Sequence, residues 1–378
     1  MSAESPSVLF YADLCRPFAP PDFETRAMGG SETALFYVAR DLAALGHQVT
    51  VVAHPGARQG VYDGVTYVDI GGAEWREYRN VDVTVVFRQL PHARRPLPGR
   101  HRLFWGHDHI GLYPELPHGI KRSLLAAAWR LGYRLFSRHA PGVVAVSRWL
   151  ANCYVEFAGW RSDRAWVIPN GVNPELFRDA DPRPPADENR PLRVAYTSVP
   201  ERGLGLLISR VMPAIWAQVP DVELHVFSYR PLEAYRALAS SAGSRVVFHG
   251  GLPQRDLART LASYDLWLYP TDFPETSCIA AMEAQAAGLP VVTSARYALR
   301  ETVEDGRTGI LIEGTVGSAE YVERFASAAV RLLQDARLRR EMGERARRRV
   351  LTEFTWSKAA QRWSQLLYEV ATDAGSHP

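Results

Sequence analysis

The sequence predicts two doubly wound α/β domains joined in series. Three observations indicate this fold class. The 378 residues are more than one ordinary core needs, short apolar β-branched runs alternate with helical patterns in both halves, and a segment rich in proline and charge separates the halves. Apolar residues make up 47% of the chain and charged residues 22%, which is typical of globular proteins and excludes a mainly disordered chain.

Strands and helices take turns through the first half. A compact apolar strand is expected at Val8–Ala12, and a helix follows at Ser31–Leu45, where apolar residues recur at helical spacing. Gly46 ends that helix. Further strands are expected at Gln48–Ala53, Val83–Phe87, Arg102–Trp105 and Val143–Val146, with a helix over Ile120–Arg138. This alternation favours a parallel sheet covered on both faces.

The second half repeats the alternation after a linker. Residues 179–191 are dense in proline and charge, which neither a helix nor a central strand tolerates. A helix is expected at Gly203–Gln218. Strands are expected at Leu192–Thr197, Val222–Ser228, Arg245–His249, Asp265–Tyr269 and Pro290–Thr293. Ligands of such sheets bind at the carboxyl ends of the strands, so the loops there are where chemistry is expected.

Charge and composition exclude several classes of protein. Lys and Arg number 44 against 41 Asp and Glu, and 44 − 41 = +3 is too weak a charge to favour a nucleic-acid partner. The three cysteines are widely spaced, and no apolar run is long enough to span a membrane, so a cytoplasmic protein is expected. Basic and apolar residues alternate over 120–140, a pattern that also allows peripheral contact with a membrane.

The segment from Tyr269 to Glu283 carries the most informative chemistry. A buried strand is expected to end at Tyr269, and a helix to begin near Thr276, with Thr276 and Ser277 as caps. The first backbone N–H groups of that helix are suited to a diphosphate. Glu275 and Glu283 would lie about two turns apart and bind hydroxyls at two ends of an extended ligand such as a sugar nucleotide, unless both are merely solvated.

Glu275 and Glu283 also match the E-x7-E motif of retaining family 4 glycosyltransferases, which have the GT-B fold. The resemblance continues in the family's order through Met28–Ala34, Leu45–Val51, Val146–Ser147, Ile168–Val172, Arg202–Gly203, 287–292, Asp305–Gly306 and Thr308–Gly309. It implies two Rossmann-like domains that face each other across a cleft. The acceptor-side domain would cover residues 1–182, the nucleotide-sugar-binding domain 183–355, and a last helix in 356–378 would cross back to the first domain.

The resemblance also implies roles for residues of the second domain. Glu275 would bind hydroxyls of the donor sugar, and Glu283 the ribose of the nucleotide. Arg202 stands where the family has a phosphate-binding lysine, and Thr197 where an arginine is usual, so one cation of the expected diphosphate site is missing. Backbone amides of the donor site would come from four consecutive residues, Thr276, Ser277, Cys278 and Ile279.

Two segments of the first half are further candidates. Gly29 and Gly30 lie between a strand and a helix, where the backbone can approach a phosphate or sugar closely. They are part of no G-x-G-x-x-G fingerprint, which argues against a nicotinamide enzyme. His107 follows an apolar strand and resembles the cleft histidine of the family, with His109 as second choice. The alternative is two loop histidines bonded to the backbone.

The resemblance implies retaining transfer of a sugar from a nucleoside diphosphate sugar to an acceptor hydroxyl on a glycan, a lipid-linked molecule or a small molecule. No cofactor and no metal are expected, because His107 and His109 have no third ligand at a matching spacing and the Asp179–Asp181 pair lies in the linker. Two alternatives stay open. One is a nucleotide-sugar epimerase of similar architecture, and the other is a degenerate nucleotide-sugar-binding protein, which Thr197 and Tyr297–Ala298 favour.

Overall fold

The computed structural model describes residues 5–109, 131–178 and 190–372. The chain forms two compact units. Unit 1 consists of residues 1–22, 29–170 and 356–378, and unit 2 of residues 23–28 and 171–355. The boundary expected at 182/183 and the Asp179–Asp181 pair lie outside the described residues, as does most of the helix expected at Ile120–Arg138, of which 131–137 is helical.

Unit 1 is built on an eight-stranded sheet in the order β3-β4-β2-β1-β5-β6-β7-β8, in which every pair is parallel except β3 with β4. The strands are β1 (Val8–Tyr11), β2 (Val49–Ala53), β3 (Gly60–Tyr62), β4 (Val65–Asp69), β5 (Val83–Phe87), β6 (His101–Gly106), β7 (Gly142–Ala145) and β8 (Ala165–Val167). The central strands β1 and β5 are buried along their whole length, as a sheet covered on both faces requires. The strands expected in this half are confirmed, and β3, β4 and β8 add to them.

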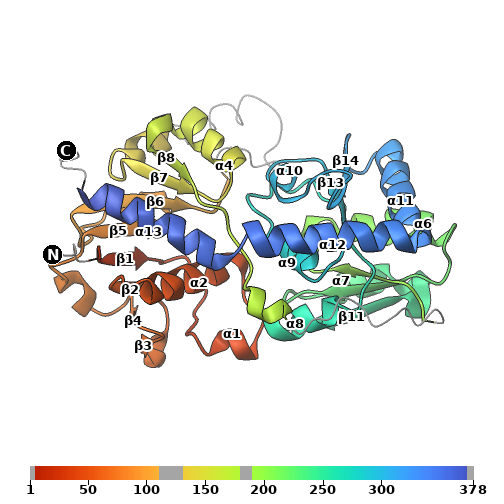
Figure 1. Ribbon diagram of the computed structural model, residues 1–378, viewed down its shortest axis with the longest axis horizontal. Helices are drawn as coiled ribbons and strands as arrows, with labels where there is room; N and C mark the ends of the chain where they lie inside the picture. Colours follow the sequence, from red (N-terminus) through yellow and green to blue (C-terminus); the bar gives the residue numbers. More distant parts are fainter. Residues whose placement is uncertain (1–4, 110–130, 179–189, 373–378) are drawn as a thin grey trace. The chain divides into compact units, whose positions relative to one another are not determined.

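Two long helices of unit 1 come from opposite ends of the chain. Helix α2 (Gly30–Ala44) packs against α13 (Trp356–Thr372), as Figure 1 shows. Trp356 stacks on Tyr37 with ring centroids 5.6 Å apart, and Trp363 lies against the ring of Trp105 at 5.0 Å. These large buried rings explain why the last 17 helical residues belong to unit 1. Unit 1 also contains the shorter helix α4 (Arg148–Cys153), with short turns at Gly56–Arg58, Glu74–Glu77, Leu90–Arg94, Tyr154–Ala158 and Ser162–Arg164. Helix α1 (Asp22–Thr25) starts at the end of the first segment of unit 1 and continues into unit 2.

Unit 2 contains a six-stranded, all-parallel sheet in the order β11-β10-β9-β12-β13-β14. Its strands are β9 (Arg193–Tyr196), β10 (Glu223–Phe227), β11 (Val246–Gly250), β12 (Leu266–Tyr269), β13 (Val291–Ser294) and β14 (Gly309–Ile312). All of the strands expected from the sequence are present, and β14 is additional.

The helices of unit 2 cover its sheet on both faces (Figure 1). They are α5 (Leu204–Leu206), α6 (Met212–Trp216), α7 (Glu233–Leu238), α8 (Gln254–Leu261), α9 (Ile279–Ala286), α10 (Leu299–Thr302), α11 (Ala319–Gln334) and α12 (Ala336–Glu353), with short turns at Pro174–Phe177, Pro200–Arg202, Leu207–Val211 and Ser240–Arg245. The single helix expected at Gly203–Gln218 corresponds to α5, the turn at Leu207–Val211, and α6.

Strand order fixes where each unit can bind a ligand. In unit 1 the order reverses between β1 and β5, and in unit 2 it reverses between β9 and β12. Loops that leave the carboxyl ends of two such strands diverge to opposite faces of the sheet, so a crevice opens between them. Ligand-binding residues are therefore expected after β1 and β5 in unit 1 and after β9 and β12 in unit 2.

Candidate functional site

The loop after β12 differs from its expected form. Helix α9 begins at Ile279 and not near Thr276, so Thr276 and Ser277 lie in the loop and do not cap the helix. The N-cap residue is Cys278, whose backbone is left-handed at φ 55° and ψ 68°. Glu283 is consequently the fifth residue of α9, closer to the helix start than two turns. Left-handed geometry at Cys278 cannot be read from a Thr-Ser-Cys sequence, because threonine and serine are the commoner caps.

The start of α9 presents a site suited to an anion. Ala281 and Met282 already donate backbone hydrogen bonds to the carbonyl of Cys278, at 3.1 and 3.3 Å. Ile279 and Ala280 are earlier in the helix, where N–H groups have no acceptor within it. Both residues are partly exposed, and the positive end of the helix dipole lies there. Of the four residues expected to supply amides, Ile279 is the one inside the helix.

Glu275 is buried in a network of polar groups. The hydroxyl of Tyr269 donates a 2.5 Å hydrogen bond to Glu275 Oε1, and Arg202 Nη1 donates to the same oxygen at 3.1 Å. Ser198 Oγ donates to the Tyr269 hydroxyl at 3.2 Å. Burial, followed by the charge of Glu275, holds the pKa of Tyr269 well above its usual value, so the phenol keeps its proton and remains a donor.

Arg202 lies after β9 and crosses to the loop after β12. Its guanidinium stands 3.8 Å from the ring centroid of Phe273 and is about one-third exposed. Burial lowers the pKa of Arg202, but the neighbouring Glu275 carboxylate more than compensates, so the pKa is raised and the charge is permanent. Gly203 permits this approach of the two loops: its φ is 115°, and a Cβ there would lie 2.1 Å from the carbonyl oxygen of Pro270.

Glu283 has a different environment from Glu275. Among the described residues, its carboxylate accepts one hydrogen bond, from Gln254 Nε2 at 3.0 Å, and forms no ion pair with an arginine or lysine. Burial raises the pKa of Glu283 to about 7, and the Gln254 hydrogen bond only partly opposes this shift. Glu283 is thus a carboxyl group that titrates near neutral pH.

Thr197, which stands in place of an arginine, is occupied by a structural contact. Its Oγ1 accepts a 2.8 Å hydrogen bond from the indole N–H of Trp267, a fully buried residue of β12. The threonine therefore satisfies a buried donor that would otherwise be costly. It supplies no charge, and Arg202 is the cation that the structure places beside Glu275.

The loop that carries Glu275 is held from the other side by residues after β13. The backbone N–H of Ala298 donates to the carbonyl of Glu275 at 3.1 Å, and Thr302 Oγ1 donates to that of Ser277 at 2.8 Å. The Ser277 hydroxyl is buried and has no hydrogen-bond partner among the described residues. Tyr297 takes a left-handed φ of 51°, so the tyrosine adopts backbone geometry that glycine adopts more easily.

Gly29 and Gly30 mark the start of α2 in unit 1. Gly29 is the N-cap and is buried, while Gly30 is the first helical residue and is exposed. A Cβ on Gly29 would lie 2.3 Å from Glu32 Oε2, and Glu32 Oε1 accepts from the backbone N–H of Arg16 at 3.0 Å. The small size of Gly29 thus lets the buried Glu32 fold back over the helix start.

His107 lies directly after β6 and is buried between the rings of Phe87 and Trp105, each 4.8 Å away. Burial, with the nearby charge of Arg88, holds the pKa of His107 well below its usual value, so the imidazole is neutral at physiological pH. Arg88 forms a two-pronged ion pair with Asp108, with both distances at 2.9 Å. His109 stacks on Trp149 at 5.8 Å.

Two of the predicted site residues, Arg202 and Glu275, meet in the structure, and Glu283 lies on the helix that follows. Gly29, Gly30 and His107 belong to unit 1, where the glycines start the helix that follows β1 and His107 follows β6. Sequence analysis missed Tyr269 and Gln254, the hydrogen-bond donors to the two glutamates. Nothing in the sequence signals either contact, because one residue ends an apolar strand and the other starts a polar helix.

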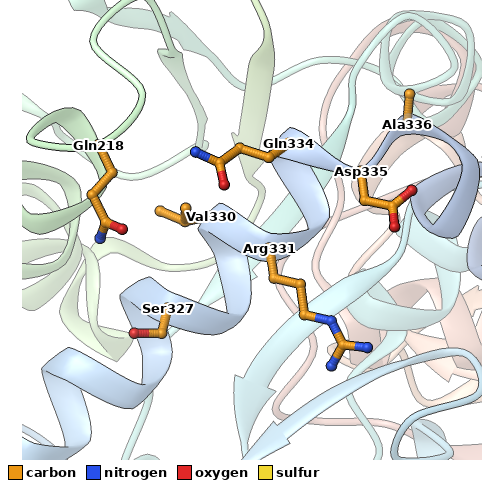
Figure 2. A pocket seen from close by; sticks show the side chains of 7 residues that line it. All are labelled: Gln218, Ser327, Val330, Arg331, Gln334, Asp335 and Ala336. Carbon is orange, nitrogen blue, oxygen red and sulfur yellow. The ribbon is translucent and has the colours of Figure 1, made fainter.

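A separate hollow of about 590 Å³ lies elsewhere on unit 2 (Figure 2). It is lined by Gln218, Ser327, Val330, Arg331, Gln334, Asp335 and Ala336. Gln218 comes shortly before β10, which places the hollow at the amino ends of the strands. Parallel sheets bind ligands at the opposite edge, and this lining holds no pair of carboxylates.

Within residues 5–109, 131–178 and 190–372, no helix is long and apolar enough to cross a membrane. The same residues contain no group of three histidine, cysteine, aspartate or glutamate side chains placed to hold a metal ion. Cys15, Cys153 and Cys278 are buried and unpaired.

Sequence comparison assigns both halves of the chain. Residues 75–176 match the family model "Glycosyltransferase Family 4", and residues 192–335 match "Glycosyl transferases group 1". The GDP-mannose-dependent α-(1-6)-phosphatidylinositol monomannoside mannosyltransferase of Mycolicibacterium smegmatis is 31% identical over 266 residues, which are 66% of this chain and 68% of that protein. The chain belongs to glycosyltransferase family 4. It is a hexosyltransferase that uses a nucleoside diphosphate sugar.

Two solved structures share the fold of this chain. Sucrose-phosphate synthase from Thermosynechococcus elongatus superposes with a TM-score of 0.76 over 97% of this chain and 99% of that one, at 20% identity. Anabaena HepE in complex with UDP and glucose gives a TM-score of 0.68 over 96% and 99%, at 18% identity. The GT-B fold implied by the sequence resemblance is therefore confirmed for this glycosyltransferase.

Proposed function

We propose that this family 4 glycosyltransferase moves a hexose, with retention of anomeric configuration, from a nucleoside diphosphate sugar bound by unit 2 to a hydroxyl group of an acceptor. The observation that carries the proposal is the Arg202–Glu275–Tyr269 network at the point where the strand order of unit 2 reverses. A fixed cation, a partnered carboxylate and a helix start come together in the place where a doubly wound sheet binds nucleotides.

The roles of the residues follow from their chemistry. Arg202 and the first N–H groups of α9 bind the diphosphate and stabilise the negative charge that grows on it as the bond to the sugar breaks. Glu275 accepts hydrogen bonds from sugar hydroxyls, and Tyr269 fixes its orientation. The acceptor oxygen forms the new bond to the anomeric carbon, and its proton passes to the departing phosphate oxygen. The protein then acts by positioning and electrostatics.

The nucleotide ribose is assigned to Glu283. An ionised carboxylate accepts hydrogen bonds from two neighbouring hydroxyls, and Gln254 holds the Glu283 carboxylate from the side. His107, neutral and set between aromatic rings, is proposed to contact the donor sugar or the acceptor as a hydrogen-bonding group and not as a charge.

We propose GDP-mannose as the donor and an inositol- or mannose-containing molecule as the acceptor. The support is the name of the M. smegmatis relative, which acts on phosphatidylinositol monomannoside. Lipid carriage of the acceptor is also compatible with the basic, apolar segment 120–140, whose sequence pattern allows peripheral membrane contact.

The test is thermal denaturation in the presence of GDP, UDP, ADP, TDP or CMP, without metal and then with Mg²⁺. A nucleotide at about 100 times its dissociation constant adds about 2.7 kcal/mol to the free energy of unfolding. Stabilisation by GDP, followed by transfer from GDP-mannose to a phosphatidylinositol mannoside, is the expected result. A shift with another nucleotide alone would replace the proposed donor. If no nucleotide raises the thermal midpoint, the result would favour a degenerate protein, whose donor site was lost together with the arginine that Thr197 replaces.

The reaction product distinguishes a transferase from the epimerase alternative. An epimerase releases free or rearranged sugar when no acceptor is present, whereas a transferase converts the donor rapidly only when the acceptor is added. Anomeric configuration of the glycoside, read by NMR, tests retention.

A further inference from the structure

One loop of unit 2 holds Arg202 from two sides. The guanidinium carbon of Arg202 stands 3.8 Å from the centroid of the Phe273 ring, and Nη1 donates to Glu275 Oε1 at 3.1 Å. Phe273 and Glu275 are two residues apart in the loop that follows β12, so one short segment makes both contacts. A singly exposed apolar side chain is common on proteins, but this one, 37% exposed, covers the cation of the proposed donor site.

The guanidinium of Arg202 lies flat against the ring of Phe273. Carbon atoms in favourable contact are about 3.5–4.0 Å apart, so a separation of 3.8 Å leaves no room for an N–H group between the guanidinium carbon and the ring. The contact of Arg236 with Phe248, also in unit 2, is wider at 4.8 Å. An arginine stacked in this way is attracted by the electrons of the ring face and is restrained from rotating out of the stacked plane.

Backbone hydrogen bonds fix the position of Phe273 in the loop. Its N–H donates to Thr271 Oγ1 at 3.0 Å, and the N–H of Glu275 donates to the carbonyl of Phe273 at 2.8 Å. The second bond closes a three-residue turn centred on Pro274, whose ring holds φ near the value that such a turn needs. Thr271 is fully buried, and its N–H donates to Ser294 Oγ at 3.0 Å. The exposed ring is therefore attached to the sheet through buried residues.

Stacking leaves the edge of the guanidinium for a ligand. Nη1 makes the one side-chain hydrogen bond that Arg202 forms within the described part of the chain, so Nε and Nη2 retain donors. Because one face of the guanidinium is against Phe273, these N–H groups point outward in its plane. Two parallel donors in one plane match two oxygens of a phosphate, a geometry that a lysine ammonium lacks. About one-third of the Arg202 side chain is exposed, which gives a ligand access to this edge.

We propose that Phe273 is a positioning residue, which holds the guanidinium of Arg202 in the orientation that binds two oxygens of the donor diphosphate. The inference rests on the proposed function, since it concerns how the diphosphate is held. Thr197, which stands where the family resemblance implies a second cation, is uncharged and bonded to Trp267. A single arginine in a fixed plane gives two directed hydrogen bonds at a smaller cost in side-chain entropy than a freely rotating one.

The first experiment compares nucleotide affinity in variants of the ring. Phe273→Leu keeps an apolar side chain and removes the aromatic face, whereas Phe273→Tyr keeps the face. GDP and GMP are titrated by calorimetry, or UDP and UMP where UDP is the nucleotide that stabilises the chain. We expect Phe273→Leu to weaken binding of the diphosphate about 3- to 10-fold and that of the monophosphate less, and Phe273→Tyr to bind both like the wild type.

Phe248→Leu is the matched control for the ring. It removes the aromatic face beneath Arg236, another arginine of unit 2, and should leave nucleotide affinity unchanged. Thermal midpoints check the folding of each variant, and Phe273→Ser replaces Phe273→Leu if the leucine variant fails to fold.

The second experiment asks whether the ring acts through Arg202. In an Arg202→Met background, Phe273→Leu should cause no further loss of diphosphate affinity. Without nucleotide, the Nε–H proton of Arg202 should resonate upfield in proton–nitrogen correlation NMR, because it lies over the ring face, and should move downfield in Phe273→Leu. Unchanged diphosphate affinity in Phe273→Leu, an equal loss in the Arg202→Met background, or an unmoved resonance would overturn this inference alone. A wild-type chain that binds no nucleoside diphosphate would overturn it together with the proposed function.

Discussion

The two glutamates of unit 2 are eight residues apart and yet have contrasting environments. Glu275 is buried, but Arg202 and Tyr269 both donate to its carboxylate. Glu283 accepts its one described hydrogen bond from a neutral amide, and burial raises its pKa to about 7. The two carboxyl groups thus differ most clearly in their partners: Glu275 has a cation and a phenol beside it, and Glu283 has a neutral amide.

This difference suits two tasks. A carboxylate with a guanidinium and a phenol donating to it is fixed in direction, as a group that orients a reacting sugar must be. A carboxyl group that lacks a cation gains its charge only as the pH rises, so it binds hydroxyls with a strength that depends on pH. The following experiments test whether the contrast holds, starting with the largest expected effect.

Removing Glu275 should have the greatest consequence. Glu275→Ala is expected to lower kcat at least about 100-fold, since the donor sugar loses the group that orients it. Arg202 stays available to the diphosphate, so nucleotide affinity should survive. Transfer rate and nucleotide binding are measured on the same preparation, with the thermal midpoint as a check on folding.

Tyr269→Phe is the companion variant, because it retains the carboxylate and removes the donor that holds it. It should lower kcat less than Glu275→Ala does. Full turnover in Glu275→Ala would remove Glu275 from the site altogether, and equal losses in the two variants would mean that packing around the ring matters more than the hydrogen bond.

Replacing Arg202 tests the environment of Glu275, the glutamate that has a cation beside it. Arg202→Met should raise the dissociation constant of the nucleoside diphosphate about 10- to 100-fold, since a hydrogen bond to a charged group contributes about 1.5–3 kcal/mol. Arg202→Lys should lose less, because it keeps the charge and loses the planar fork. Calorimetric titration gives both values.

Arg236→Met is the matched control for Arg202. Arg236 also belongs to unit 2 and lies over an aromatic ring, that of Phe248 at 4.8 Å. Equal losses of affinity in Arg236→Met and Arg202→Met would show a general effect of charge on binding and contradict a specific contact.

Replacing Glu283 tests the other glutamate, whose raised pKa of about 7 should make nucleotide binding depend on pH. Nucleotide affinity should fall about tenfold from pH 8 to pH 6 as a carboxyl group with a pKa of about 7 takes up its proton. Glu283→Gln should bind with a much flatter pH dependence. Gln254→Leu should move the fall to higher pH, because the Gln254 hydrogen bond opposes the rise in pKa.

As pH rises, the free energy of unfolding should fall, whereas nucleotide affinity should increase. The pKa of Glu283 is higher in the folded chain than the usual 4.5, so the folded state binds the proton more tightly than the unfolded state. The free energy of unfolding therefore falls as pH rises from about 4.5 to about 7, and Glu283→Gln lacks this contribution. Urea denaturation across this range measures it, and identical profiles in the two proteins would show that Glu283 has an ordinary pKa.

Much of the fold and part of this contrast could be predicted from the sequence. Apolar runs located the central strands, and Glu275 was expected in the loop that follows a strand end, whereas Arg202 came only from the family resemblance. The donors Tyr269 and Gln254 could not be predicted, since each contact depends on how a side chain is aimed in three dimensions. The proximity of His54, His92 and Arg95 to Asp13 could not be predicted either, because these residues follow three different strands.

The start of α9 was placed three residues too early because the sequence offered Thr276 and Ser277 as caps, whereas the helix begins after a left-handed Cys278. That residue lies between the two glutamates and sets the turn that separates their environments.

Replacing Cys278 should have the smallest effect of the substitutions considered. A non-glycine residue with this geometry costs about 1–2 kcal/mol, while glycine restores about 0.5–1 kcal/mol of chain entropy to the unfolded state. Cys278→Gly should therefore change the free energy of unfolding by no more than about 1 kcal/mol and preserve transfer. Cys278→Val, which places a β-branched side chain at the same φ, should be clearly destabilising in urea denaturation. If valine were tolerated as well as glycine, the left-handed turn would not be needed, and the two glutamates would owe their difference to partners alone.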